Sequence, residues 1–163
     1  LITNIIGAMI VFSPAYANTA TAQNFVTTAS IANEFEIEAS QLAIKTSRNS
    51  EVKNFARQMV EDHNKTGQDM QQALSASASG ARPAGTLDLK HQKMLEKLQS
   101  SSGESFDQQY IQMQTQAHKD AVKLFEDYSK NGDDPVLKQF ASQTLPSLEK
   151  HLTHVQEIDV TRK

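Results

Sequence analysis

Residues that interrupt helices are few in this sequence, and they gather in a few places. Four prolines and six glycines occur among 163 residues, and six of these ten lie near residues 80–85, 103 and 132–135. The long segments between these places are rich in Ala, Gln, Lys, Glu and Leu, which favour helices, and they lack the alternating β-branched pattern of strands. The chain is therefore expected to be all-α.

Hydrophobic periodicity divides the chain into four long amphipathic helices, because apolar residues recur at spacings of three, four and seven. We expect these helices over residues 21–46, 50–76, 104–130 and 135–158. Short turns pair them into two antiparallel hairpins, and a connector of about 26 residues, with a short helix over 87–99, joins the hairpins. The pattern predicts a four-helix bundle with a long middle crossover that carries a short extra helix.

The turn between the last two long helices has typical helix-ending and helix-starting residues. Gly132 is expected to take the left-handed conformation that ends a helix. Asp134 is expected to cap the next helix, and Pro135 suits its first position. Pro146 lies inside that helix and is expected to kink it.

The first seventeen residues are typical of a secretory signal peptide. The apolar run from Ile5 to Phe12 is shorter than the roughly 20 residues that span a bilayer, and Ala15 and Ala17 suit a signal peptidase. We expect residues 1–17 to be a signal peptide cleaved after Ala17, and residues 18–163 to form one helical domain with no membrane span. The alternative is an uncleaved anchor. Export without cysteine favours a bacterial periplasm or outer surface.

Composition excludes several classes of protein. The chain has no cysteine, so it has no disulfide framework, thiolate metal site or cysteine nucleophile. The formal net charge is −3, and no long Lys/Arg cluster is present to contact phosphates. Nucleic acid is therefore not an expected partner.

Four polar residues lie on or near the apolar stripes that should face the bundle interior. Glu36, His63 and His151 complete the stripes of their helices, and His118 lies about 60° from the middle of its helix's inner face. Counted from the turns, Glu36, His63 and His118 share one level, whereas His151 falls about 7 Å lower unless a kink or an offset corrects it. One carboxylate and two or three imidazoles are ligands that zinc, iron and copper prefer.

Other side chains on these helices are candidates to support the site. Asp62 is either a further ligand or the acid that orients His63. Tyr110 needs a partner for its buried hydroxyl, and Asp107 is more typical of a helix start. Met59 and Met113 would suit cuprous copper, although methionines at this spacing usually fill the core.

The buried polar residues leave several interpretations open. The Glu-x-x-His pairs of di-iron bundles are absent, which disfavours a di-iron oxidase. A mononuclear metal site fits better, as does a metal-free polar network that fixes helix register. A third interpretation is a pH-responsive switch, since buried histidines charge in acid.

Several segments together resemble a bacterial family of unknown function numbered 4142. They are Glu36–Ile37, Leu42–Ala43, Val52–His63, Phe106–Tyr110, His118 and Leu145–Leu152. The resemblance covers about residues 22–158. It implies a ferritin-like bundle that is exported and often labelled an outer-membrane protein, with no established biochemical role. The positions that match the family's polar residues are Glu36, Asp62, His63, Asp107, Tyr110, His118 and His151.

Together these features predict an exported periplasmic protein of unassigned function, with outer-membrane association as an alternative location. The expected cofactor is one transition metal (Zn, Fe or Cu), bound by Glu36, His63 and His118 with His151 as a candidate fourth ligand. Asp62, Tyr110 and Asp107 would surround that site. The alternative is a non-catalytic envelope or stress-related interaction module without metal. Catalysis is not implied.

Overall fold

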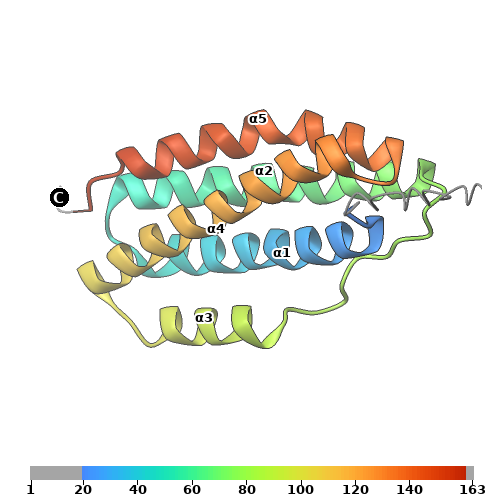
Figure 1. Ribbon diagram of the computed structural model, residues 1–163. Coiled ribbons are helices and arrows are strands. Elements are labelled where there is room, and N and C mark those ends of the chain that lie inside the picture. The colour runs from blue at the N-terminus through green and yellow to red at the C-terminus, as the bar shows by residue number, and fades with distance from the viewer. Residues whose placement is uncertain (1–19, 161–163) are drawn as a thin grey trace, which may run out of the picture.

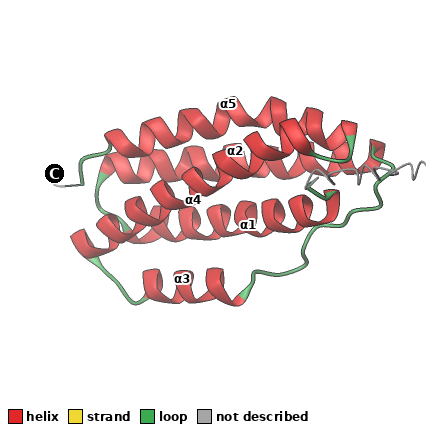
Figure 2. Cartoon of the chain, in the orientation of Figure 1, coloured by secondary structure: helices red, strands yellow, loops and turns green. Residues whose placement is uncertain are grey.

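The structure is a computed structural model, and it describes residues 20–160. Five helices make up this part of the chain: α1 (Ala22–Thr46), α2 (Ser50–Ala76), α3 (Leu89–Gln99), α4 (Gly103–Asn131) and α5 (Pro135–Glu157). Figure 2 shows these helices joined by loops, with no strand drawn in the described part. The predicted all-α fold is therefore confirmed, while the predicted signal segment lies outside the described residues.

The four long helices form the expected bundle of two hairpins. Helix α1 pairs with α2 and α4 pairs with α5, and the hairpins meet where α1 packs on α4 and α2 packs on α5. Along the chain in Figure 1, α2 and α4 run opposite to α1 and α5. The crossover returns along the outside of the bundle, where α3 lies beside α1. One long crossover between two hairpins is the connectivity of ferritin-like bundles.

Side-chain caps begin the helices close to their predicted positions. The Asn49 carboxamide oxygen accepts from the backbone of α2, the Asp88 carboxylate from that of α3, and the Asp134 carboxylate from that of α5. Each bond satisfies a backbone N–H that has no partner within its helix. Pro135 stands in the first turn of α5, as predicted, and the helix continues through Pro146.

The apolar core is divided into two clusters, one toward each end of the bundle. One includes Phe35, Phe55, Met59, Phe106 and Tyr110, and the other includes Phe25, Met70, Phe125, Tyr128 and Leu148. A buried histidine lies between the two clusters in sequence on α2, α4 and α5, and these residues are His63, His118 and His151. On α1 the buried Glu36 directly follows Phe35 of the first cluster. The bundle therefore has a polar layer near its middle.

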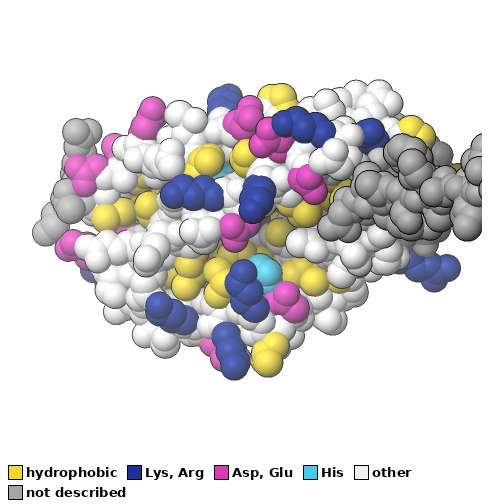
Figure 3. Space-filling model, in the orientation of Figure 1, with side chains coloured by type: hydrophobic (Ala, Val, Ile, Leu, Met, Phe, Trp, Pro, Cys, Tyr) yellow, Lys and Arg dark blue, Asp and Glu magenta, His cyan; other side chains and the backbone are white. Residues whose placement is uncertain are grey.

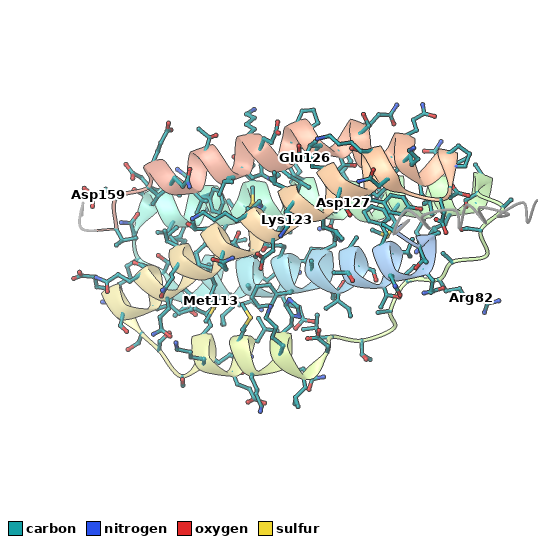
Figure 4. The ribbon with its side chains drawn as sticks, in the orientation of Figure 1. Arg82, Met113, Lys123, Glu126, Asp127 and Asp159 are labelled. Atoms are coloured by element: carbon teal, nitrogen blue, oxygen red, sulfur yellow. The ribbon has the colours of Figure 1, made fainter. Side chains whose placement is uncertain are left out.

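Met59 and Met113, the two methionines that would suit cuprous copper, pack with the apolar core. Met59 is fully buried in the first cluster, and Met113 packs against the same cluster. Figure 4 shows Met113 between α4 and α3. Their surroundings favour gap-filling in the apolar core.

Two features of the described part bear on membranes and polyanions, namely the apolar length of its helices and the pattern of its surface charges. None of the described helices combines the length and apolar character needed to cross a bilayer. Basic and acidic side chains are interspersed on the face in Figure 3. A Lys/Arg stripe that could follow phosphates is not seen on this face.

Gly132 follows the end of α4 as predicted, but it does not take the predicted left-handed conformation. Its φ is −62°, which any residue can adopt. Glycine is needed there for space, because a Cβ at residue 132 would lie 2.7 Å from the Tyr128 ring. That ring stacks on Phe25 with centroids 4.0 Å apart, so it cannot move freely.

Gly132→Ala is expected to lower the free energy of unfolding by about 1–3 kcal/mol, the usual cost of overpacking. Urea unfolding would measure the change. Gly85→Ala is the matched control, because a Cβ there meets nothing within 4 Å. Equal stabilities of the two variants would contradict the packing explanation.

A candidate metal centre in the bundle core

Three histidines from three helices meet in the polar layer. They are His63 of α2, His118 of α4 and His151 of α5, and no more than 5% of any of them is exposed. One ring nitrogen of each lies within 4.8 Å of one ring nitrogen of each of the others. Their ring centroids are 5.4–5.8 Å apart. The structure thus places three imidazoles around one point.

Each imidazole is oriented through one ring nitrogen. His63 Nδ1–H donates to Asn33 Oδ1 at 3.0 Å, and His118 Nδ1–H donates to the backbone oxygen of Gln114 at 2.9 Å. His151 Nε2–H donates to Asp62 Oδ2 at 2.8 Å. Histidine ligands in metalloproteins are usually held in this way through the nitrogen that does not bind the metal.

The other nitrogen of each ring has no hydrogen-bond partner among the described residues. These atoms are His63 Nε2, His118 Nε2 and His151 Nδ1. Because the opposite nitrogen of each ring donates its proton, the unpartnered nitrogen carries a lone pair. The three rings therefore offer three buried lone pairs.

Two expectations about this cluster need correction. Asp62 orients His151 rather than His63, because the ring of His63 is held from α1 by Asn33. His151 is not displaced along the bundle from the other histidines. Counting residues from the turn assumes parallel axes, whereas α4 runs obliquely to α1 and α5 in Figure 1.

Glu36 of α1 borders the same site. Glu36, His63 and His118 line one cavity of about 20 Å³ whose walls include Ala32 and Ala117. This volume is enough for about one water molecule. The small alanine side chains leave the space open. Glu36 lies beside the three histidines but does not belong to the group whose ligand atoms lie within 4.8 Å of one another.

Burial favours the neutral form of every titratable group in this layer. It raises the pKa of Glu36 to about 8, although the nearby Gln114 amide acts in the opposite direction. It lowers the pKa of His118 to about 4. Burial also holds the pKa of His63 well below its usual value, with further lowering by His118 and His151.

The pKa of His151 is also lowered by burial, although the Asp62 carboxylate opposes the shift. In the absence of a cation, the cluster is therefore uncharged near neutral pH. Neutral imidazole is the form that binds metals.

Sequence reasoning missed two residues that support the site. Gln114 is fully buried. Its backbone oxygen holds His118, and its side-chain amide approaches Glu36 without reaching hydrogen-bond geometry. The available signal was its spacing, since Gln114 lies four residues from both Tyr110 and His118 on α4. Asn33 gave no comparable signal, because neutral polar residues are common on exposed helix faces.

Tyr110 and Asp107 lie apart from the histidines. The Tyr110 hydroxyl pairs with Ser40 Oγ at 2.8 Å, and its ring packs in the cluster of Phe55 and Phe106. Asp107 is buried one turn earlier on α4. No hydrogen bond joins either residue to the three histidines within residues 20–160.

The donor set fits a transition metal. Seven buried polar atoms in this layer lack partners in the described part of the chain: three histidine nitrogens, two Glu36 oxygens and two side-chain atoms of Gln114. Leaving such atoms unpaired costs about 1–3 kcal/mol each. A cation bound by the imidazoles and the carboxylate would satisfy most of these atoms at once.

The fold and this layer define a class of helical bundle with a buried histidine cluster. The chain belongs to the family described as domain of unknown function (DUF4142), whose sequence pattern matches residues 11–158. The predicted family is thereby confirmed. No curated protein matches the sequence significantly.

Several solved structures share the fold. CopM in its Cu(II)-bound form superimposes with a TM-score of 0.69 at 18% identity, over 85% of this chain and 95% of that chain. A DUF305 fragment from Deinococcus radiodurans gives a TM-score of 0.72 at 15% identity, over 89% and 99% of the two chains. A DUF305 protein from Streptomyces coelicolor, described as secreted, gives 0.66 at 16% identity, over 80% and 85%. At such identities the likeness shows the fold alone.

Proposed function

We propose that this is an exported protein that binds one transition-metal ion in the core of its helical bundle. His63, His118 and His151 would be ligands, and Glu36 would supply a fourth. The observation that carries the proposal is the meeting of three buried histidines, with one ring nitrogen of each within 4.8 Å of the others. Each ring also has one nitrogen without a partner in the described chain. A polar layer that served only to fix helix register would be expected to pair each of these nitrogens with a hydrogen-bond donor.

The donor set indicates which ions the site would take. Imidazole and carboxylate suit zinc, copper and iron, whereas thiolate and thioether ligands select softer ions. The chain has no cysteine, and Met59 and Met113 pack in the apolar core. The fold shared with CopM, which has been crystallised with copper and with silver, supports metal binding as the role of such a bundle.

The site is proposed as mononuclear and non-catalytic. Di-iron bundles use a carboxylate from every helix, whereas the cavity between the described helices is lined by Glu36 alone among the acids. A closed site with protein ligands serves to store an ion or to stabilise the fold. An oxidase is therefore not proposed.

Export is supported by the leader-like residues 1–17 and by the secreted DUF305 neighbour. We propose a periplasmic location, with cleavage after Ala17 and residues 18–163 as the mature domain. Attachment to the outer membrane is the alternative location.

Metal analysis tests the proposal. Protein purified without an affinity tag and supplied with Zn(II) or Cu(II) is expected to retain about one ion per chain, the capacity of a single tetrahedral site. His63→Ala should lose that ion, because it removes one ligand. His154→Ala should keep it, because His154 lies on α5 outside the cluster and packs against Phe55.

A metal-free wild type, with unfolding unchanged by added Zn(II), Cu(II) or Fe(II), would contradict metal binding. That result would favour the second candidate, an envelope interaction module with a buried polar network. The hydrogen bonds that His63 donates to Asn33 and His151 donates to Asp62 favour such a network, since they connect α1 with α2 and α2 with α5.

A further inference from the structure

A groove lies outside the bundle on the side that α3 and the crossover cover. Its volume is about 640 Å³, and its walls come from α1, α2, α3 and residues 83–87. The volume of the groove is much larger than that of the cavity at the histidines, which is about 20 Å³. The groove therefore brings solvent close to a polar layer that is otherwise buried.

One side chain connects the groove with the histidine cluster. Asn33 lines both the groove and the inner cavity. It is half-buried, and its Oδ1 accepts the hydrogen bond from His63. An ion that moves from the groove to the cluster on this side has to pass Asn33.

A glycine gives this side chain room. Gly67 lies inside α2, one turn after His63, where glycine costs about 1 kcal/mol relative to alanine. Its φ is not positive, so the backbone does not require glycine. A Cβ at residue 67 would lie 3.4 Å from Asn33 Nδ2. This is an ordinary contact that leaves Asn33 in place and narrows the space into which its side chain can turn.

The charge of the groove favours a cation. Glu34, Glu38 and Glu96 line it, and the residues that form its walls include no Lys, Arg or His. None of the three glutamates belongs to an ion pair found within residues 20–160. Carboxylates without counter-charges raise the local concentration of cations.

We propose that this groove is the route by which a hydrated divalent cation reaches the histidine cluster, and that Asn33 is the side chain that turns aside to admit it. The route rests on the proposed metal site. A second groove of about 570 Å³, between α2 and α5, is the rival. The lining of this second groove includes Lys65 as well as acids. One of these acids, Asp62, already accepts a hydrogen bond from His151.

Metal-transfer kinetics test the route. Zn(II) would be delivered from a chromophoric chelator and removed by excess EDTA, with both rates followed by stopped flow. Gly67→Ala is expected to slow loading and release alike by about tenfold, the effect of about 1.4 kcal/mol on a barrier. The dissociation constant should not change, because a barrier on the route affects both directions equally.

Two further variants separate the route from other effects. Glu34→Gln, Glu38→Gln and Glu96→Gln together should slow loading at low salt, and the difference should vanish at high salt as the charges are screened. Gln143→Trp fills part of the rival groove, which Gln143 lines, and should leave both rates unchanged.

Unchanged rates in Gly67→Ala, or slowing by Gln143→Trp instead, would overturn the route and leave the metal site intact. Failure of the wild type to bind Zn(II) at equilibrium would overturn the site and the route together. Gly67→Ala should fold at least as stably as the wild type, since alanine favours helix. Thermal unfolding checks this, so that slow kinetics cannot be attributed to misfolding.

Discussion

Glu36→Gln is expected to raise the free energy of unfolding of the metal-free protein by about 4 kcal/mol at pH 8, and by little at pH 4.5. The pKa of Glu36 is raised from 4.5 to about 8 in the folded protein. Its contribution to stability is therefore complete below pH 4.5 and is lost as the pH rises toward 8, because only the unfolded chain ionises in that range. Glutamine keeps the shape of the neutral acid without this titration.

Urea unfolding of both proteins across this pH range would measure the effect. Glu34→Gln is the matched control on the same helix, because Glu34 is exposed and its replacement should change stability by less than about 0.5 kcal/mol. Glu36→Gln should also weaken Zn(II) binding, since it removes a carboxylate ligand. A variant no more stable than the wild type at pH 8 would show that Glu36 is not held neutral.

The metal-free Glu36→Gln variant is expected to lose at least about 2.5 kcal/mol of stability as the pH falls from 7 to 4.5. The pKa of His118 is lowered from 6.5 to about 4 by burial, and burial also holds the pKa of His63 well below its usual value. A lowered pKa contributes stability that is complete above pH 6.5 and is lost as the pH falls toward the folded value. The unfolded chain then takes up protons that the folded cluster resists.

The wild type should show a smaller net change over the same range. Its Glu36 regains stability as the pH falls, and this gain offsets the loss at the histidines. Adding His118→Gln to the Glu36→Gln variant should remove most of the acid-induced loss of stability that His118 causes. Urea unfolding at pH 7 and 4.5 would measure this difference. Equal acid losses with and without His118 would contradict its assignment as a buried neutral imidazole.

The helices could be predicted closely because their signals are local. Asn49, Asp88 and Asp134 cap α2, α3 and α5 with their own side chains. The apolar spacing fixed the face of each helix that packs inward. Gly132 shows the limit of such local rules, since its role depends on the position of the Tyr128 ring, which only the packed turn determines.

The candidate site was less predictable because it depends on how the helices are offset. The stripes identified His63, His118 and His151 as inward-facing, and all three are buried. The level of His151 and the partner of Asp62 depend on how α5 lies against α2 and α4, and single-helix periodicity does not contain this information. Asn33 and Gln114 become recognisable only when His63 and His118 are seen against them.

X-ray absorption at the zinc edge of the Zn(II)-loaded protein tests the shared site most directly. We predict a first shell of three imidazole nitrogens and one oxygen at about 2.0–2.1 Å, and no such shell in His63→Ala, which should not retain the ion. A shell made only of oxygens, or one that His63→Ala leaves unchanged, would contradict the binding of an ion between these helices.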